Sequence, residues 1–310
     1  MSNSFHHISV LPKETMELLQ PQKGSRFIDG TLGAGGHSGM ILETNPDAEL
    51  IGIDQDREAL AAAGKNLEKY GDRVNLFHGT FSQMKEFCAE KGWDSVDGIL
   101  LDIGVSSHQI DTAERGFSFR EDGPLDMRMN RRNPLSASTI INQYSEEQLK
   151  TIFKEYGEVK RAGAVARAIV ADREKKPFER TGELAGLIDR VDKVTGRRQS
   201  SAVLYFQALR IAVNDELGEL ERALEDAVDL LAPSGRLTII SFHSLEDRMV
   251  KKFFNRLSAD CICPPDFPVC VCNTVPKLKV ITRKVVTATK KELAENSRAA
   301  CARLRAAEKI

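Results

Sequence analysis

The sequence contains no apolar run that approaches the ~20 residues of a membrane-spanning helix. Residues 1–12 also lack the charged and apolar regions of a signal peptide. We therefore expect a cytoplasmic protein with no membrane partner. The chain has 310 residues, of which 41% are hydrophobic and 29% charged, so it can form one large domain or two moderate ones.

A disulfide framework is absent as well, because Cys88 and Cys301 stand alone in the sequence. The other four cysteines form two Cys-x-Cys pairs that are six residues apart: Cys261, Cys263, Cys270 and Cys272. Four clustered thiolates suit zinc, but zinc knuckles commonly use Cys-x-x-Cys pairs. We therefore expect reduced structural cysteines and no metal, with zinc as the alternative.

The net charge of the chain is only −1, but positive and negative residues are unevenly distributed along the sequence. Residues 1–100 carry 9 Lys and Arg against 15 Asp and Glu. The ratio reverses to 11 against 6 in residues 160–198 and to 10 against 3 in residues 273–310. Two basic regions around an acidic one could form a groove for phosphates, although charge alone favours solvated helix surfaces.

One glycine-rich stretch, residues 29–38, has the sequence Asp-Gly-Thr-Leu-Gly-Ala-Gly-Gly-His-Ser and lies between an apolar strand and a helical pattern. A turn of this kind brings bare backbone and a helix N-terminus close to a nucleotide-like ligand. It is an incomplete dinucleotide fingerprint, because the third glycine of G-x-G-x-x-G falls at Ser38. The turn therefore predicts a nucleotide-like ligand without identifying it.

Strands and helices alternate after this turn, which predicts a parallel sheet covered on both faces. Three buried strands are expected in this part of the chain: 49–54, 74–79 and 96–102. Asp54 ends the first of them, where a carboxylate can accept hydrogen bonds from both ribose hydroxyls of NAD or S-adenosylmethionine. Asp56 is interpreted as an acid at the start of the next helix.

The alternation is interrupted after residue 102 by a loop region and about eighty residues of helical periodicity. One of these helices is expected to begin at a capping box formed by Ser145 and Gln148. Later strands are expected at 236–242, 277–286 and 302–306. We therefore predict a discontinuous α/β domain with a helical insertion, divided as 1–112, 113–213 and 214–310.

Six segments carry a family resemblance over nearly the whole chain: 29–38, 101–107 (Leu-Asp-Ile-Gly-Val-Ser-Ser), 115–119 (Arg-Gly-Phe-Ser-Phe), 123–129 (Gly-Pro-Leu-Asp-Met-Arg-Met), 206–217 (Phe-Gln-Ala-Leu-Arg-Ile-Ala-Val-Asn-Asp-Glu-Leu) and 241–248 (Ser-Phe-His-Ser-Leu-Glu-Asp-Arg). The chain resembles the ribosomal RNA small subunit methyltransferase H (RsmH or MraW) family. The resemblance implies a class I, Rossmann-like fold. It also implies transfer of a methyl group from S-adenosylmethionine to the exocyclic N4 of a cytidine in the decoding region of 16S rRNA.

The resemblance implies cofactor-binding roles for matching residues: Gly35, Gly36, His37, Asp54, Phe81, Asp102 and Gln109. Gly35, Gly36 and His37 would line the methionine end, and Asp54 would hold the ribose. Phe81 would pack on the adenine, while Asp102 and Gln109 would complete the site. By residue type alone, Phe81 is better explained as a core aromatic, and His37 could be an ordinary first-turn helix residue.

Chemistry makes Asp102 the first candidate catalytic residue. The lone pair of the cytosine amine is delocalised into the ring, so an acceptor near the amine assists its attack on the sulfonium methyl group. Many amino-methyltransferases have Asp/Asn-Pro-Pro-Tyr/Phe at this strand end, whereas this chain has Asp-Ile-Gly-Val. This departure leaves open which side chain stacks on the target base and whether Asp102 contacts the amine or only the cofactor. His243 and the adjacent Ser244 are further candidates for the target pocket, or caps of the helix that begins at Leu245.

RNA contacts are expected from the helical insertion and the basic C-terminus, because a base that is modified must leave its stack. Many family members have a His-Pro-Ala-Thr-Arg-like stretch before the segment at Phe206, where this chain has Ser-Ser-Ala-Val-Leu-Tyr. Arg197 and Arg198 are our hypothesis for a replacement. The expected partner is 16S rRNA in the small ribosomal subunit, and the sequence does not decide between a monomer and a homodimer.

Two alternative functions are considered beside this one. An NAD-dependent oxidoreductase would explain the glycine turn and Asp54, but the third glycine is missing and no matching catalytic pair is present. A non-catalytic RNA- or ribosome-binding protein could use a methyltransferase scaffold, but the full set of cofactor residues argues against it.

Overall fold

The computed structural model describes residues 9–193, 200–263 and 270–310 of the chain. The chain divides into two compact units. The sheet unit comprises residues 1–104 and 218–310, and the helical unit comprises residues 105–217.

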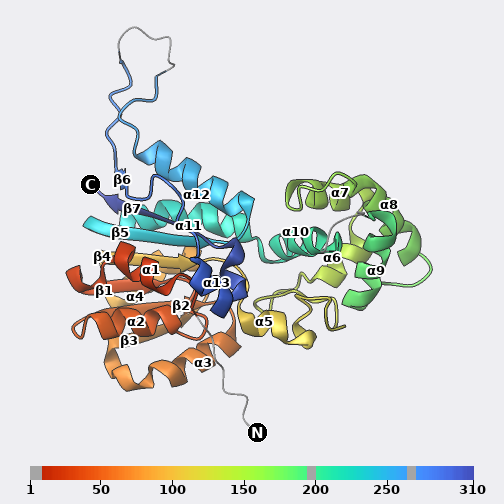
Figure 1. The fold of residues 1–310 in the computed structure, drawn as a ribbon, viewed down its shortest axis with the longest axis horizontal. Coiled ribbons are helices and arrows are strands. Elements are labelled where there is room, and N and C mark those ends of the chain that lie inside the picture. Colours follow the sequence, from red (N-terminus) through yellow and green to blue (C-terminus); the bar gives the residue numbers. More distant parts are fainter. Residues whose placement is uncertain (1–8, 194–199, 264–269) are drawn as a thin grey trace. The chain divides into compact units, whose positions relative to one another are not determined.

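The sheet unit is built on a seven-stranded sheet in the order β3-β2-β1-β4-β5-β7-β6 (Figure 1). Neighbours from β3 to β5 run parallel, and β7 runs antiparallel to both β5 and β6. The strands are β1 (Arg26–Asp29), β2 (Glu49–Asp54), β3 (Val74–His78), β4 (Val96–Asp102), β5 (Leu231–Ser241), β6 (Leu278–Val280) and β7 (Arg303–Lys309). The expected Rossmann-like α/β fold with a helical insertion between its fourth and fifth strands is confirmed.

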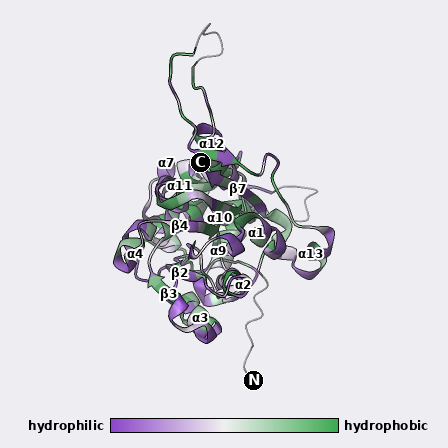
Figure 2. Ribbon diagram, turned by 90° about the vertical axis from the view of Figure 1, so that its left-hand side faces the viewer, coloured by the Kyte–Doolittle hydropathy of each residue, from purple (hydrophilic) through white to green (hydrophobic). Residues whose placement is uncertain are grey.

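Helices cover both faces of the sheet, which explains why its strands are continuously apolar. Successive residues of a strand point to opposite faces: Phe27 lies in one core cluster and Ile28 in the other. The covering helices are α1 (Pro12–Leu19), α2 (Gly36–Thr44) and α3 (Arg57–Leu67) on the first face, and α4 (Met84–Lys91), α11 (Glu216–Leu230) and α12 (Ser244–Leu257) on the second. In Figure 2 the surface helices α3 and α4 carry hydrophilic residues, whereas the ribbon near β4 is largely hydrophobic.

The last strands differ from their expected boundaries. β5 begins at Leu231 instead of Arg236, and its register with β4 shifts between Val96 and Gly98. β6 covers only three residues of the predicted strand 277–286, because it is an edge strand that pairs on one side. β7 is longer than the predicted 302–306, since it pairs with β5 and β6. A short helix, α13 (Lys290–Glu295), precedes β7.

The helical unit has its own hydrophobic core. Its helices are α5 (Ser107–Asp111), α6 (Ala137–Gln143), α7 (Glu146–Glu155), α8 (Ala162–Arg173), α9 (Thr181–Val191) and α10 (Ala202–Asn214). The capping box predicted at the start of α7 is confirmed: the Gln148 N–H donates to the Ser145 hydroxyl, and the Ser145 N–H donates to the Gln148 side chain. Tyr205 is fully buried in the core and its hydroxyl donates to the Asp192 carboxylate at 2.7 Å.

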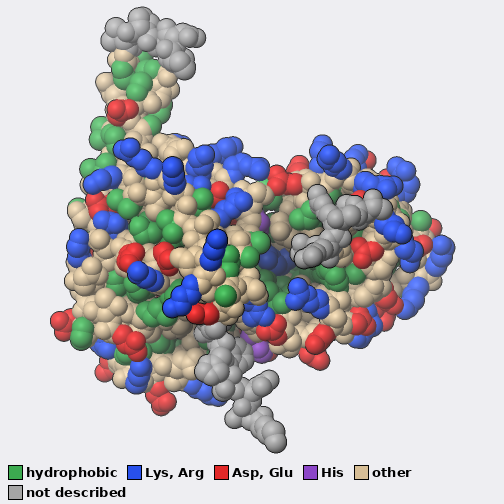
Figure 3. Space-filling model, in the orientation of Figure 1, with side chains coloured by type: hydrophobic (Ala, Val, Ile, Leu, Met, Phe, Trp, Pro, Cys, Tyr) green, Lys and Arg blue, Asp and Glu red, His purple; other side chains and the backbone are tan. Residues whose placement is uncertain are grey.

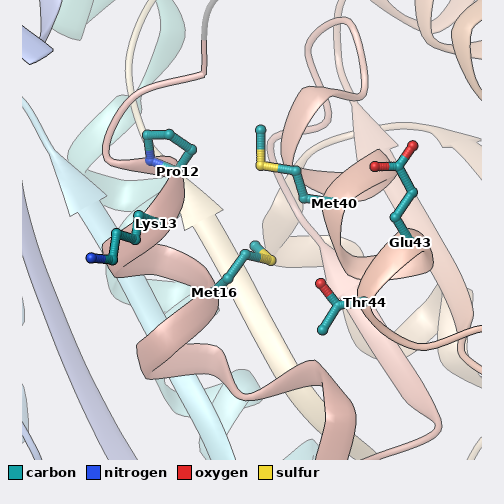
Figure 4. A pocket seen from close by; sticks show the side chains of 6 residues that line it. All are labelled: Pro12, Lys13, Met16, Met40, Glu43 and Thr44. Atoms are coloured by element: carbon teal, nitrogen blue, oxygen red, sulfur yellow. The ribbon is translucent and has the colours of Figure 1, made fainter.

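A shallow pocket of about 460 Å³ lies between α1 and α2 (Figure 4). Its lining includes Met16, Met40 and Glu43, none of which is a predicted site residue. Among the residues described, no helix has the length and apolar character that crossing a membrane requires.

Candidate active site

The candidate site of the sheet unit lies where the strand order reverses. β1 and β4 are adjacent, while their connections lead to opposite sides of the sheet, and ligands of open α/β sheets bind beyond the carboxyl ends of strands at this point. Asp29 ends β1 and Asp102 ends β4. The topology therefore brings two carboxylates and the glycine turn to one edge of the sheet.

The glycine turn has a backbone conformation that requires glycine. Gly33 has φ +52° and Gly35 has φ +81°, both in the left-handed region. A Cβ on Gly35 would also come within 2.9 Å of Leu67. Within residues 9–193, 200–263 and 270–310, a Cβ on Gly33 would meet no atom closer than the Thr31 carbonyl oxygen at 4.0 Å, so this part of the structure leaves the backbone open to a ligand. Gly35 is the N-cap of α2 and Gly36 is its first residue, as the turn-then-helix pattern predicts.

Asp54 is held against this turn from the end of β2. Its Oδ2 accepts the Gly33 N–H at 2.8 Å, and its Oδ1 accepts the Asp56 N–H at 2.8 Å. Each carboxylate oxygen can accept a further hydrogen bond, as binding both ribose hydroxyls requires. Asp56 is the N-cap of α3 and accepts the Glu58 N–H at 3.0 Å, which confirms its interpretation as a helix-start acid.

His37 connects the glycine turn to the end of β4. Its Nε2 lies 2.9 Å from the Val10 carbonyl oxygen, and its Nδ1 lies 3.6 Å from Asp102 Oδ2. Because a carbonyl only accepts hydrogen bonds, Nε2 carries a proton and donates it. If the imidazole is neutral, its only N–H is therefore on Nε2, and Nδ1 has no proton. A proton shared by Nδ1 and Asp102 Oδ2 then belongs either to a protonated Asp102 carboxyl group or to an imidazolium form of His37.

One oxygen of Asp102 has no partner among the residues that the structure describes. This Oδ1 is buried and makes no hydrogen bond with them, while the Asp102 backbone N–H donates to the Thr31 hydroxyl at 2.5 Å. Buried carboxylate oxygens are normally hydrogen-bonded, so an orphaned one at a strand end points to a partner that arrives with a ligand.

Sequence reasoning missed Asp29 as a member of this acidic group. It is 1% exposed, accepts the Ser38 hydroxyl at 2.6 Å and accepts the Thr31 N–H at 3.2 Å. These bonds tie β1 to the first turn of α2. Its position directly after an apolar strand was the available signal.

Burial makes the three acids at this edge weak. It raises the pKa of Asp29 to about 6, of Asp54 to about 7 and of Asp102 to about 8. The charges of Asp29 and Glu246 raise the pKa of Asp102 further. Near neutral pH these three carboxyl groups are therefore partly protonated, whereas aspartates on the protein surface are ionised.

Phe81 packs in the core. It is 8% exposed and belongs to the cluster that contains Ile28 and Leu101, as its residue type alone suggests. A Cβ on Gly30 would come within 2.9 Å of Phe81 Cβ, so the ring is closely held beside β1. Only a small part of its surface is left for a ligand.

His243 caps α12, one of its two interpretations from sequence. Its Nδ1 accepts the Glu246 N–H at 3.3 Å, and its Nε2 lies 3.0 Å from Glu246 Oε1. The other oxygen of Glu246 accepts the Phe242 N–H at 2.9 Å. His243 Nε2 and Glu246 Oε1 approach without the angle of a hydrogen bond, so these buried atoms join Asp102 Oδ1 as polar groups without a hydrogen-bond partner. Sequence reasoning missed Glu246, although it stands three residues after the cap.

Gln109 lies in the helical unit. It is 5% exposed and closes a capping box on α5, in which its side chain accepts the Ser106 N–H at 3.0 Å and its N–H donates to the Ser106 hydroxyl at 3.2 Å. The structure thus gives it a local structural role. Arg197 and Arg198 lie outside the described residues.

The residues of the sheet unit fit a nucleoside-containing cofactor. The open backbone at Gly33 allows close approach, Asp54 offers acceptors for ribose hydroxyls, and Asp102 presents an unpartnered oxygen at the adjacent strand end. The arrangement can place a small electrophile beside a buried proton acceptor.

Comparison with known proteins identifies the family. The curated relatives include ribosomal RNA small subunit methyltransferase H of Heliobacterium modesticaldum and that of Geobacter sulfurreducens, each 51% identical over 310 residues; the alignments cover 99% of this chain and 99% and 100% of those proteins. A solved rRNA methylase from Streptococcus thermophilus aligns over 96% of this chain and 93% of its own, with a TM-score of 0.41 and 10% identity. The model of the MraW methylase family matches residues 4–310. The chain therefore belongs to the MraW methylase family.

Proposed function

We propose that this protein transfers a methyl group from S-adenosylmethionine to the exocyclic N4 of a cytidine in the decoding region of 16S rRNA, in the cytoplasm. Membership of the methylase family and the ribosomal RNA methyltransferases among its relatives support this function. The observation that carries the chemistry is the buried, unpartnered Oδ1 of Asp102 at the end of β4. The family does not favour the oxidoreductase alternative.

The cofactor residues follow from the site geometry. Asp54 would accept the ribose hydroxyls, and the open backbone at Gly33 would let the cofactor approach the turn. Gly35, Gly36 and His37 surround the N-terminus of α2, where N–H donors suit a carboxylate such as that of the methionine moiety. S-adenosylmethionine supplies an electrophilic methyl carbon on a sulfonium centre.

Phe81 and Gln109 remain part of the proposed cofactor site with smaller contributions. Phe81 is mainly a core residue, so its contact with the adenine would use only the ring surface that is still exposed. Gln109 stays a predicted cofactor residue, and its capping box with Ser106 would fix the position of its side chain.

Asp102 and His37 would accept the proton that the target amine loses. In its ionised form Asp102 accepts a hydrogen bond from the target amine through Oδ1, which localises the nitrogen lone pair for attack. Oδ2 faces His37 Nδ1, so a proton taken up by the pair can sit on either group. Positioning of the two reacting atoms supplies much of the remaining acceleration.

His243 is the second catalytic candidate in this proposal. Its ring is held by Glu246, and it stands at the N-terminus of α12 beyond the end of β5. β5 pairs directly with β4, with Ile240 opposite Asp102. His243 would therefore shape the pocket for the target base beside Asp102.

The helical unit would bind the RNA. Figure 3 shows many Lys and Arg side chains on this unit. Five exposed cations of residues 160–193 pair with acids of the same unit: Arg167, Lys175, Lys176, Arg180 and Arg190. Their attraction for phosphate is therefore weaker than their number suggests, and the RNA contacts would also draw on shape and stacking.

The test supplies labelled S-adenosylmethionine with one of three acceptors: unmodified small ribosomal subunits, free 16S rRNA or a synthetic decoding-region hairpin. The modified nucleoside is then mapped. We expect N4-methylcytidine at one position in at least one acceptor, and the preferred acceptor identifies the natural substrate. Absence of label from all three, with cofactor binding verified by calorimetry, would refute the proposed function.

A further inference from the structure

A stalk projects from the sheet unit between α12 and β6. Its two arms, residues 258–263 and 270–277, run side by side (Figures 1 and 2). The Lys277 N–H closes the base by donating to the Leu257 carbonyl oxygen at 2.8 Å. Farther out, Ile262 is 65% exposed and Val271 is 66% exposed. Because these apolar side chains are not buried, hydrophobic packing does not hold the described arms together.

Four thiols meet between the arms instead. The sulfurs of Cys261, Cys263, Cys270 and Cys272 all lie within 4.8 Å of one another. Cys270 and Cys272 sulfurs are 3.5 Å apart, and those of Cys272 and Cys261 are 3.9 Å apart. All four are free cysteines, and both members of each Cys-x-Cys pair point to the same centre.

The backbone around the thiols has a reciprocal arrangement. The residue between the first pair, Ile262, donates its N–H to the Cys272 sulfur at 3.4 Å. The residue between the second pair, Val271, donates its N–H to the Cys263 sulfur at 3.4 Å. Each arm thus hydrogen-bonds a sulfur of the other arm, and N–H donors of this kind stabilise thiolates over thiols.

We propose that Cys261, Cys263, Cys270 and Cys272 bind a structural zinc ion that joins the arms of the stalk. A tetrahedral zinc with Zn–S bonds of 2.3 Å has sulfurs about 3.8 Å apart, close to the spacing observed here. The sequence-based preference for reduced cysteines without metal rested on the Cys-x-Cys spacing, which differs from the Cys-x-x-Cys pairs common in zinc knuckles. In the structure both thiols of each turn converge.

Zinc binding requires no oxidant or reductant. Each thiol gives up its proton to solvent as its sulfur bonds to zinc, so the metal competes with protons for the site. Bound zinc would also explain how the arms of the stalk, which have no hydrophobic core of their own, are held together at their cysteines.

Metal analysis of the freshly reduced full-length protein tests the site. After incubation with zinc and removal of excess metal by gel filtration, we expect about one zinc per chain, bound to four thiolates. Substitution with cobalt should give the thiolate charge-transfer and d–d bands of a tetrahedral four-sulfur site. Less than half an equivalent of zinc, stoichiometric iron in its place, or a cobalt spectrum without thiolate bands would each overturn the proposal.

Matched variants locate the metal. Cys261→Ser with Cys270→Ser removes one ligand from each arm and should lower bound zinc at least about fivefold, because two thiolates do not form a closed site. Cys301→Ser changes an exposed cysteine outside the cluster and should retain the full equivalent. Equal zinc in the double variant and the control would overturn the assignment. The cobalt spectrum of the unaltered protein decides the question if the double variant does not fold, and neither result depends on the proposed methyl transfer.

Discussion

Two polar clusters of the sheet unit contrast in how they are held. The acids at the carboxyl edge, Asp29, Asp54 and Asp102, are fixed by strands with a hydrophobic core on both faces. The four thiols of the stalk are fixed by two backbone hydrogen bonds and are exposed or half-buried. In the first cluster the fold changes the acidity of the carboxyl groups by excluding water from them. In the second, a ligand would have to supply the stability that the fold does not.

The contrast also appears in protonation. Burial raises the pKa of each acid at the carboxyl edge, so protons are retained near neutral pH. In the stalk the shifts have both signs, because hydrogen bonds lower the pKa of Cys272 while hydrogen bonds to neighbouring thiols raise the pKa of Cys261. The first arrangement suits a proton acceptor in a reaction, whereas the convergence of four sulfurs in the second suits a metal ion.

The largest effect is expected for Asp102→Asn. The amide keeps the shape of the carboxyl group but cannot take up the amine proton, so methyl transfer should fall by roughly 100-fold or more. Cofactor affinity should change far less. Single-turnover transfer and calorimetry measure the two quantities, with the exposed Asp47→Asn as the control. A single-turnover rate within about threefold of that of the unaltered protein would show that Asp102 does not take part in the methyl-transfer step.

Asp54→Asn should weaken S-adenosylmethionine binding by about 10-fold to 100-fold, the usual value of hydrogen bonds to a charged group. In the unaltered protein, affinity should rise as the pH passes upward through about 7, because the carboxylate that accepts the ribose hydroxyls then becomes ionised. The variant should lose this pH dependence. Calorimetric titrations at several pH values measure both effects, and the exposed Asp72→Asn serves as the control. An unchanged affinity would contradict the ribose role.

A smaller effect is expected on stability. The folded protein keeps the Asp102 proton up to a pKa of about 8, whereas an unfolded chain loses it near 3.8. The stabilisation is therefore fully present below pH 4 and is lost as the pH rises toward 8. Asp102→Asn mimics the protonated group at every pH, so it should gain about 2 kcal/mol relative to the unaltered protein between pH 5 and pH 6.5. Urea unfolding of both proteins at the two pH values tests this, and a constant difference would show that Asp102 does not titrate there.

The smallest global effect is expected for zinc removal. A chelator should make residues 258–277 more accessible to protease, while the thermal midpoint changes by no more than about 2 °C, because the stalk contributes little to the core. Limited proteolysis and calorimetry on the same samples separate the local from the global effect. The Cys301→Ser protein should respond like the unaltered one. Protection that is insensitive to the chelator would mean that the arms are held without metal.

Much of the sheet was predictable because its signal is local. The strands 49–54 and 96–102 are continuous apolar runs that end in an acid, and both match the structure. Edge strands were predicted less well: β6 is shorter and β7 longer than their apolar patterns, because strand length there depends on the available partner. The capping box of α7 was recognisable because Ser145 and Gln148 stand three positions apart, whereas Glu246 of the α12 box was missed although it has the same spacing from His243.

The site was predictable only in part. Glycines of the turn and Asp54 follow from a motif and its spacing. The partnership of His37 with Val10 and Asp102, the burial of Asp29 and the contact of His243 with Glu246 depend on distances that no local pattern encodes.

By itself the sequence determined the α/β alternation, the helical insertion and the family, because these depend on periodicity and on runs of adjacent residues. Only the tertiary structure decided that four thiols from two turns converge, and that one oxygen of Asp102 is buried without a partner in the described part of the chain. Both are consequences of long-range packing: strand order determines which side chains meet at an edge, and burial determines which of them keep a proton.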